Sequence, residues 1–140
     1  MGGYIFRFPA DVPKLTYEAL NAYVLATPQG RAYVRRDIGT TVTVTLGDGC
    51  ARLTLYGYTL AAIYPGRVEF NATDDAHMST TAWLGKIVRD NKLGGTAWRI
   101  RRHASDGEGP CVPRGHAGLL TIDGHRSEPV FGQTYLIPAS

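Results

Sequence analysis

Three of the four histidines begin a His-x-Ser triplet, and these residues have the types and spacing that could do chemistry. The triplets are His77-Met78-Ser79, His103-Ala104-Ser105 and His125-Arg126-Ser127. A histidine exchanges a proton near neutral pH, and a neighbouring hydroxyl can donate a hydrogen bond to a phosphate oxygen. Two such pairs around one bond would supply a general acid, a general base and two phosphate donors. The triplets therefore raise the hypothesis of a two-histidine phosphoesterase, with His77, His103 and His125 as candidate catalytic residues.

The position of each triplet favours a plainer interpretation. A histidine and the hydroxyl two residues later share a face only if the triplet lies inside a strand. The first triplet instead stands at the expected start of a helix, where Ser79 would cap the helix. The second triplet enters an expected loop, and the third leaves a turn. We therefore expect surface or capping roles for these residues, and an enzyme is the least favoured of three functional hypotheses.

A metal hypothesis gathers four residues of the C-terminal third whose side chains are common zinc ligands. They are His103, Cys111, His116 and His125. Their spacing matches no compact zinc module, and the chain holds enough apolar residues to form a core without a metal. The segments Gly47-Asp48-Gly49 and Gly107-Glu108-Gly109 lack the spacing of nucleotide-binding loops. The sequence therefore predicts no metal and no other cofactor.

Basic residues gather on one expected strand and one expected helix. Arg99, Arg101 and Arg102 belong to the strand, and Lys86 and Arg89 belong to the outer face of the helix. The three strand arginines, with His103 and together with Arg35 and Arg36, could form a basic face that holds the phosphates of a nucleic acid while aromatic rings stack on its bases. Strand alternation also sends Arg99 and Arg101 toward solvent, where arginine is ordinary, and the net charge is only +3. The candidate binding residues are Arg99, Arg101, Arg102, Lys86 and Arg89, and nucleic-acid binding through the basic strand face is an alternative to protein binding.

The composition bounds the class of protein. The 140 residues are 44% hydrophobic and 19% charged, which is typical of a single globular domain over residues 1–140 and excludes a disordered tail. No apolar run approaches the roughly 20 residues that span a membrane, and the opening residues lack the pattern of a leader. Cys50 and Cys111 are far apart in the sequence and are expected to be free thiols, which favours a cytoplasmic location.

The N-terminal part, residues 1–28, is expected to hold one strand and one helix. The aromatic and β-branched run 3–8 predicts the strand. Apolar residues at helical spacing predict the helix over 15–25. Pro28 disfavours helical geometry before it, and a turn is expected at Gly30, so the helix should stop there.

The central part, residues 29–102, is expected to be a β-meander with a helix. Alternation of apolar and polar residues predicts strands over 41–46, 53–56, 59–64, 67–71 and 98–102. The turn residues Gly47-Asp48-Gly49 predict a hairpin between the first two strands. The second helix would be capped by Ser79 or Thr80 and would end at Leu93-Gly94-Gly95. Its apolar stripe would be formed by Trp83, Leu84, Ile87 and Val88.

The C-terminal part, residues 103–140, is rich in glycine and histidine. Its composition predicts a loop over 104–118 and short strands over 119–122 and 135–137. The elements together predict an α+β fold. It would be mainly an antiparallel β-meander, with one or two helices packed on one face.

Four segments of the central part occur in an order found in a known group of proteins. They are Leu53-Thr54-Leu55-Tyr56-Gly57-Tyr58-Thr59-Leu60-Ala61, Gly66-Arg67-Val68-Glu69-Phe70, Ser79-Thr80-Thr81-Ala82-Trp83-Leu84 and Trp98-Arg99-Ile100. Over residues 29–102 the chain resembles uncharacterised small proteins of tailed phages of actinobacteria. The resemblance implies a viral origin and a strand–turn–strand–helix–strand fold, and it implies no catalytic residues.

The favoured interpretation is a non-enzymatic phage or prophage accessory protein. It would bind a protein partner or assemble with itself through exposed strand edges and the basic helix. Its location would be the host cytoplasm or the virion, and no membrane partner is expected. The alternatives are nucleic-acid binding through the basic strand face and, after that, the two-histidine phosphoesterase.

Overall fold

The computed structural model describes residues 7–55, 57–71, 78–102, 115–122, 125–127 and 133–138. Over these residues the helices are α1 (Tyr17–Leu25), α2 (Pro28–Tyr33) and α3 (Met78–Asp90). The strands are β1 (Arg35–Ile38), β2 (Val42–Gly47), β3 (Cys50–Leu55), β4 (Tyr58–Ile63), β5 (Arg67–Phe70), β6 (Gly95–Arg102), β7 (Gly115–Ile122), β8 (His125–Ser127) and β9 (Gln133–Leu136). The predicted α+β fold with an antiparallel meander is confirmed.

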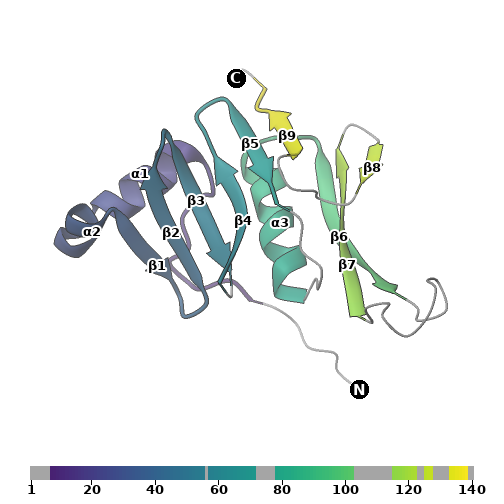
Figure 1. Ribbon diagram of the computed structural model, residues 1–140, viewed down its shortest axis with the longest axis horizontal. Coiled ribbons are helices and arrows are strands. Elements are labelled where there is room, and N and C mark those ends of the chain that lie inside the picture. Colours follow the sequence, from purple (N-terminus) through teal and green to yellow (C-terminus); the bar gives the residue numbers. More distant parts are fainter. Residues whose placement is uncertain are drawn as a thin grey trace.

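The strands form two antiparallel sheets (Figure 1). In the six-stranded sheet, β1 to β5 pair in chain order and β9 returns to pair with β5. In the smaller sheet, β7 lies between β6 and β8. The second sheet, the helix α2 and the strand β1 were not expected from the sequence. β7 also begins at Gly115, inside the predicted loop 104–118.

One face of the six-stranded sheet is buried because apolar residues alternate along its strands. The register places Val44 opposite Leu53, and Leu53 opposite Ala61, so apolar side chains line up across three strands. On β5 the buried residues are Val68 and Phe70. These side chains form the core together with apolar residues of α1 and α3.

Helix α1 forms much as predicted: it begins at Tyr17, two residues after the expected start, and ends at Leu25 as expected. Thr16 caps it with a side-chain oxygen that accepts a hydrogen bond from the Ala19 N–H at 3.3 Å. Leu20 and Val24 are buried, and α1 contacts β1, β2 and β3. The expected turn at Pro28–Gly30 is wrong, because Pro28 instead occupies the first turn of α2.

Helix α3 lies between the two sheets in Figure 1. Its predicted apolar stripe is confirmed, since Trp83, Leu84, Ile87 and Val88 are all buried in the core. The helix contacts β6 and β7 as well. The predicted boundaries are shifted: α3 spans Met78–Asp90, so the expected caps Ser79 and Thr80 are buried inside its first turn.

The segment before α1 packs against α3. The rings of Phe8 and Trp83 meet edge to face with centroids 4.9 Å apart. The Asp90 carboxylate accepts a hydrogen bond from the Leu15 N–H at 2.9 Å, and the Asn91 amide donates to the Leu15 carbonyl at 2.8 Å. Of the expected strand 3–8, residues 3–6 lie outside the described ranges, and residues 7 and 8 are not in a strand.

Candidate functional site

The candidate site is the outer edge of β1, the first strand of the six-stranded sheet. The Val34 carbonyl accepts a hydrogen bond from the Leu46 N–H of β2 at 2.8 Å. A trans peptide then directs the Arg35 N–H to the opposite side, away from β2. Backbone groups alternate along a strand, so Arg36 faces β2 whereas Arg35 and Asp37 face outward. No described strand pairs with that outer side.

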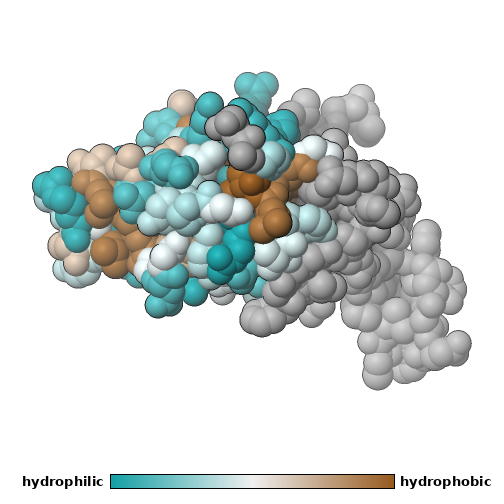
Figure 2. Space-filling view, turned by 90° about the horizontal axis from the view of Figure 1, so that it is seen from above, coloured by the Kyte–Doolittle hydropathy of each residue, from teal (hydrophilic) through white to brown (hydrophobic). Residues whose placement is uncertain are grey.

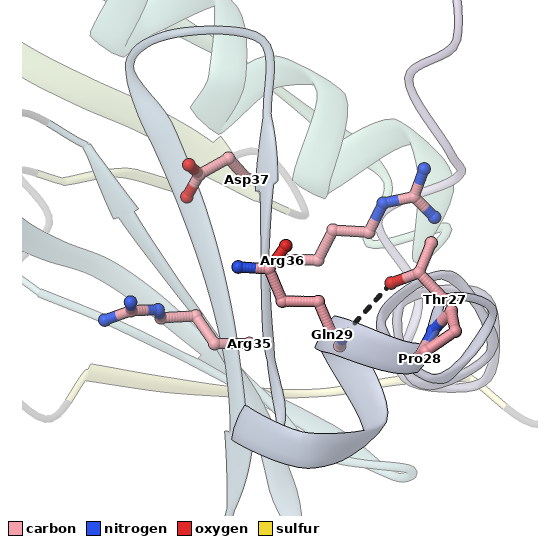
Figure 3. A pocket seen from close by; sticks show the side chains of 7 residues that line it. Thr27, Pro28, Gln29, Arg35, Arg36 and Asp37 are labelled. Atoms are coloured by element: carbon pink, nitrogen blue, oxygen red, sulfur yellow. Dashed lines mark hydrogen bonds between the residues drawn. The ribbon is translucent and has the colours of Figure 1, made fainter.

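A hollow of about 600 Å³ lies beside this edge. Its lining residues come from the start of α2 and from β1: Thr27, Pro28, Gln29, Gly30, Arg35, Arg36 and Asp37. Figure 3 shows that Arg35 and Arg36 point to opposite sides of the strand, as alternation requires. The Gln29 side chain projects from α2 into the space between them. The hollow therefore lies beside the outward edge of β1, and the Gln29 amide extends toward it from α2.

Local interactions hold α2 beside the edge. The Thr27 hydroxyl accepts a hydrogen bond from the Gly30 N–H at 3.0 Å and caps the helix. A Cβ added at Gly30 would lie 1.8 Å from the Val24 carbonyl oxygen, so only glycine permits this approach of α2 to α1. At the other end, Val34 adopts left-handed geometry with φ 50° and turns the chain directly into β1. This conformation is strained for a β-branched residue.

Of the three charged side chains on β1, Arg36 and Asp37 have interaction partners within the fold, and Arg35 is exposed. The Arg36 guanidinium stacks on the Tyr23 ring at 3.9 Å and donates to the Tyr23 carbonyl at 2.9 Å. The Tyr23 hydroxyl in turn donates to the Asp37 carbonyl at 2.7 Å. Burial raises the pKa of the Tyr23 phenol above 10.0, and Arg36 opposes that shift. The Asp37 carboxylate accepts from the Thr43 hydroxyl, and Arg35 is exposed.

Apolar side chains are exposed close to this edge in the sequence. Tyr33 is 66% exposed, Val34 43% and Leu25 36%. Figure 2 shows hydrophobic residues at the left-hand end of the molecule, the end that carries α2 in Figure 1. Exposed apolar groups beside a strand edge are typical of interaction surfaces. This end of the molecule therefore exposes apolar side chains as well as the outer edge of β1.

The histidine hypotheses fall mostly on residues outside the described ranges. His77, His103 and Cys111 lie there, so the structure does not place them. The backbone of His116 lies on β7, and that of His125 on β8. Among the described residues, no group of three or more His, Cys, Asp or Glu side chains could hold a metal ion. The phosphoesterase remains an untested prediction.

The candidate binding residues lie on α3 and β6, which contact each other, whereas Arg35 and Arg36 of the expected basic face lie on β1. Arg99, Arg101 and Arg102 are on β6, and Lys86 and Arg89 are on α3. Arg89 is exposed, as expected. Lys86 was expected on the outer face, but its side chain is only 14% exposed and its Nζ lies 2.7 Å from the Asp90 carboxylate. The charge of Lys86 is therefore neutralised within the fold.

Sequence reasoning weighed Arg35 and Arg36 only as part of a basic face and missed the edge strand around them. The pair Thr27-Pro28 carried the missed signal, because a capping residue followed by proline also starts a helix. A helix ending at Tyr33 leaves Arg35–Ile38 as a short strand next to the predicted hairpin. The position of that strand at the sheet edge could be read only from the structure.

The described part of the chain contains no helix that is both long and apolar enough to cross a membrane. Searches with the chain found no matching family model, no matching curated protein and no matching solved structure. The function is therefore argued from the fold and from the geometry of the β1 edge.

Proposed function

We propose that this chain is a non-enzymatic protein-binding domain that pairs an extended segment of a protein partner with β1. The outward backbone groups of Arg35 and Asp37 beside the hollow carry the proposal. An open strand edge is a template for another strand, and added strands gain backbone hydrogen bonds while side-chain pockets supply specificity. The hollow between α2 and β1 would take the side chains of such a segment.

Two further features support this proposal. β1 has only four residues and three of them are charged, which limits indiscriminate edge-to-edge aggregation while leaving room for a matched partner. The resemblance to small proteins of actinobacterial tailed phages favours an assembly role in the host cytoplasm or the virion. Nucleic-acid binding through the basic strand face is the weaker proposal, because the Arg36 guanidinium is already held on the Tyr23 ring and carbonyl.

The test is selection of binders from a random peptide library on the immobilised protein. We expect extended peptides that bind the wild type and lose binding to Asp37→Pro, because proline removes the outward N–H of that residue. Lys14→Asp, a change at an exposed position outside β1, is the matched control and should bind normally. Peptides that bind Asp37→Pro as tightly as the wild type would contradict the proposal.

A further inference from the structure

We infer that the segment that pairs with β1 is β1 of a second copy of this chain. The two strands run antiparallel and place Arg35 of each copy opposite Asp37 of the other. This inference rests on the proposed edge binding and adds the identity of the occupant. The sequence of β1, Arg35–Ile38, is complementary to itself in this arrangement.

The register follows from which residues face outward. Only Arg35 and Asp37 of β1 direct their backbone groups away from β2, so a partner strand must bond to these two. When a two-fold axis passes beside Arg36, Arg35 of one copy faces Asp37 of the other, twice. Each facing pair exchanges two backbone hydrogen bonds, which makes about four in the interface. Closed two-fold contacts of this kind are the commonest in homo-oligomers.

The side chains select this register over its neighbours. Arg35 and Asp37 lie on the same face of β1, and directly opposed residues have Cβ atoms about 5 Å apart. The proposed register therefore forms two cross-strand Arg–Asp ion pairs. A shift by two residues would oppose Arg35 to Arg35, or Asp37 to Asp37, which places like charges together. Such a shift would also lose half of the backbone hydrogen bonds, so charge and backbone pairing favour the same arrangement.

The groups already at the edge are compatible with a second strand. The Asp37 carbonyl accepts from the Tyr23 hydroxyl, and a carbonyl oxygen has a second lone pair for an incoming N–H. The two Arg36 residues would meet at the axis, but each guanidinium is held on its own Tyr23 ring and carbonyl. Gln29 is exposed and would rotate out of the space that it enters in Figure 3.

Val34 lies at the end of the proposed interface, directly before β1. In this register Val34 of one copy lies opposite Ile38 of the other copy, whose side chain is 1% exposed and belongs to the core of its own copy. Val34 is 43% exposed in a single copy and holds a strained left-handed conformation. Strained backbone persists where the surrounding structure enforces it, and it clusters at functional sites.

Charge exchange tests the inference. The wild type should show a concentration-dependent mass in analytical ultracentrifugation that approaches twice the monomer mass. Arg35→Asp alone and Asp37→Arg alone should each weaken self-association at least about tenfold, because both contacts then join like charges. An equimolar mixture of the two variants should associate again, because each contact in the mixed pair joins an acid to a base. Lys14→Asp should behave as the wild type.

A wild type that stays monomeric at every concentration would overturn the inference, as would single variants that associate normally. If peptides from the library still bind the wild type but not Asp37→Pro, the proposed function survives that result.

A second experiment uses only the wild type, so it tests the inference even if the variants fail to fold. Amide hydrogen exchange of Arg35 and Asp37 should slow as the protein concentration rises, whereas the exchange of Gly66 in a distant turn should not. Unchanged exchange at all three amides would contradict the inference.

Discussion

The buried amide of Asn91, the residue directly after α3, holds the N-terminal segment in place. The Asn91 amide donates to the carbonyls of Leu15 and Ile87 at 2.8 and 2.9 Å, and Asn91 is only 3% exposed. Removing the amide leaves a buried carbonyl that water cannot reach, which costs about 1–3 kcal/mol. Asn91→Ala should lower the free energy of unfolding by that amount in urea titrations. Arg89→Ala, on the exposed face of α3, should change it little. Equal effects of the two changes would contradict the role of Asn91.

Tyr23 makes the site sensitive to alkaline pH. Burial raises the pKa of its phenol above 10.0, Arg36 lowers it, and the carboxylates of Asp11 and Asp37 raise it. A raised pKa in the folded state means that the stability contributed by the protonated phenol is complete below pH 10 and is lost as the pH rises through the folded pKa. Tyr23→Phe should therefore lose less stability than the wild type when urea titrations are compared below and above pH 10. An identical loss in both proteins would exclude Tyr23 as a contributor.

At the scale of elements, the placement of α2 depends on the absence of a side chain at Gly30. A Cβ there would lie 1.8 Å from the Val24 carbonyl oxygen. This oxygen belongs to the backbone of α1, so it cannot move aside as the end of a flexible side chain can. Gly30→Ala should lower the free energy of unfolding by about 1–3 kcal/mol, the usual cost of overpacking. The control is Gly66→Ala, because an added Cβ at Gly66 meets nothing within 4 Å. Thermal melts that rank both variants equally would show that α2 does not need this close approach.

The elements that the sequence predicted are those with a strong local pattern. Alternation and a glycine turn gave the hairpin of β2 and β3, and the apolar stripe gave α3. The helix α2 was missed because Pro28 disfavours helix before it and favours helix after it, and only the first effect was considered. The strand β1 was missed because Arg-Arg-Asp carries no apolar alternation. Pairing of β9 with β5 joins segments that are far apart in the sequence, so no local pattern could reveal it.

The candidate site depends on the whole molecule for the same reason. The sequence shows that Arg35 and Asp37 are charged, but their outward direction follows from the pairing of β1 with β2. That β1 is an edge follows from the order of all six strands. Sequence reasoning could therefore name strand edges as a class of binding surface, and it could not choose this edge among the others.

The position of α3 predicts that the described part of the molecule unfolds as one unit. Its apolar residues share a buried cluster with the six-stranded sheet, and the helix also contacts β6 and β7 of the smaller sheet. The chain has two tryptophans, Trp83 on α3 and Trp98 on β6. In Trp83→Phe, the fluorescence of Trp98 and the far-ultraviolet circular dichroism should show the same urea midpoint, as a two-state transition requires. Ile87→Ala added to this variant should move both midpoints together, because it opens a cavity that costs about 2–5 kcal/mol. A Trp98 transition at lower urea that Ile87→Ala leaves in place would mean that the smaller sheet unfolds separately, and residues 1–140 would then not form a single domain.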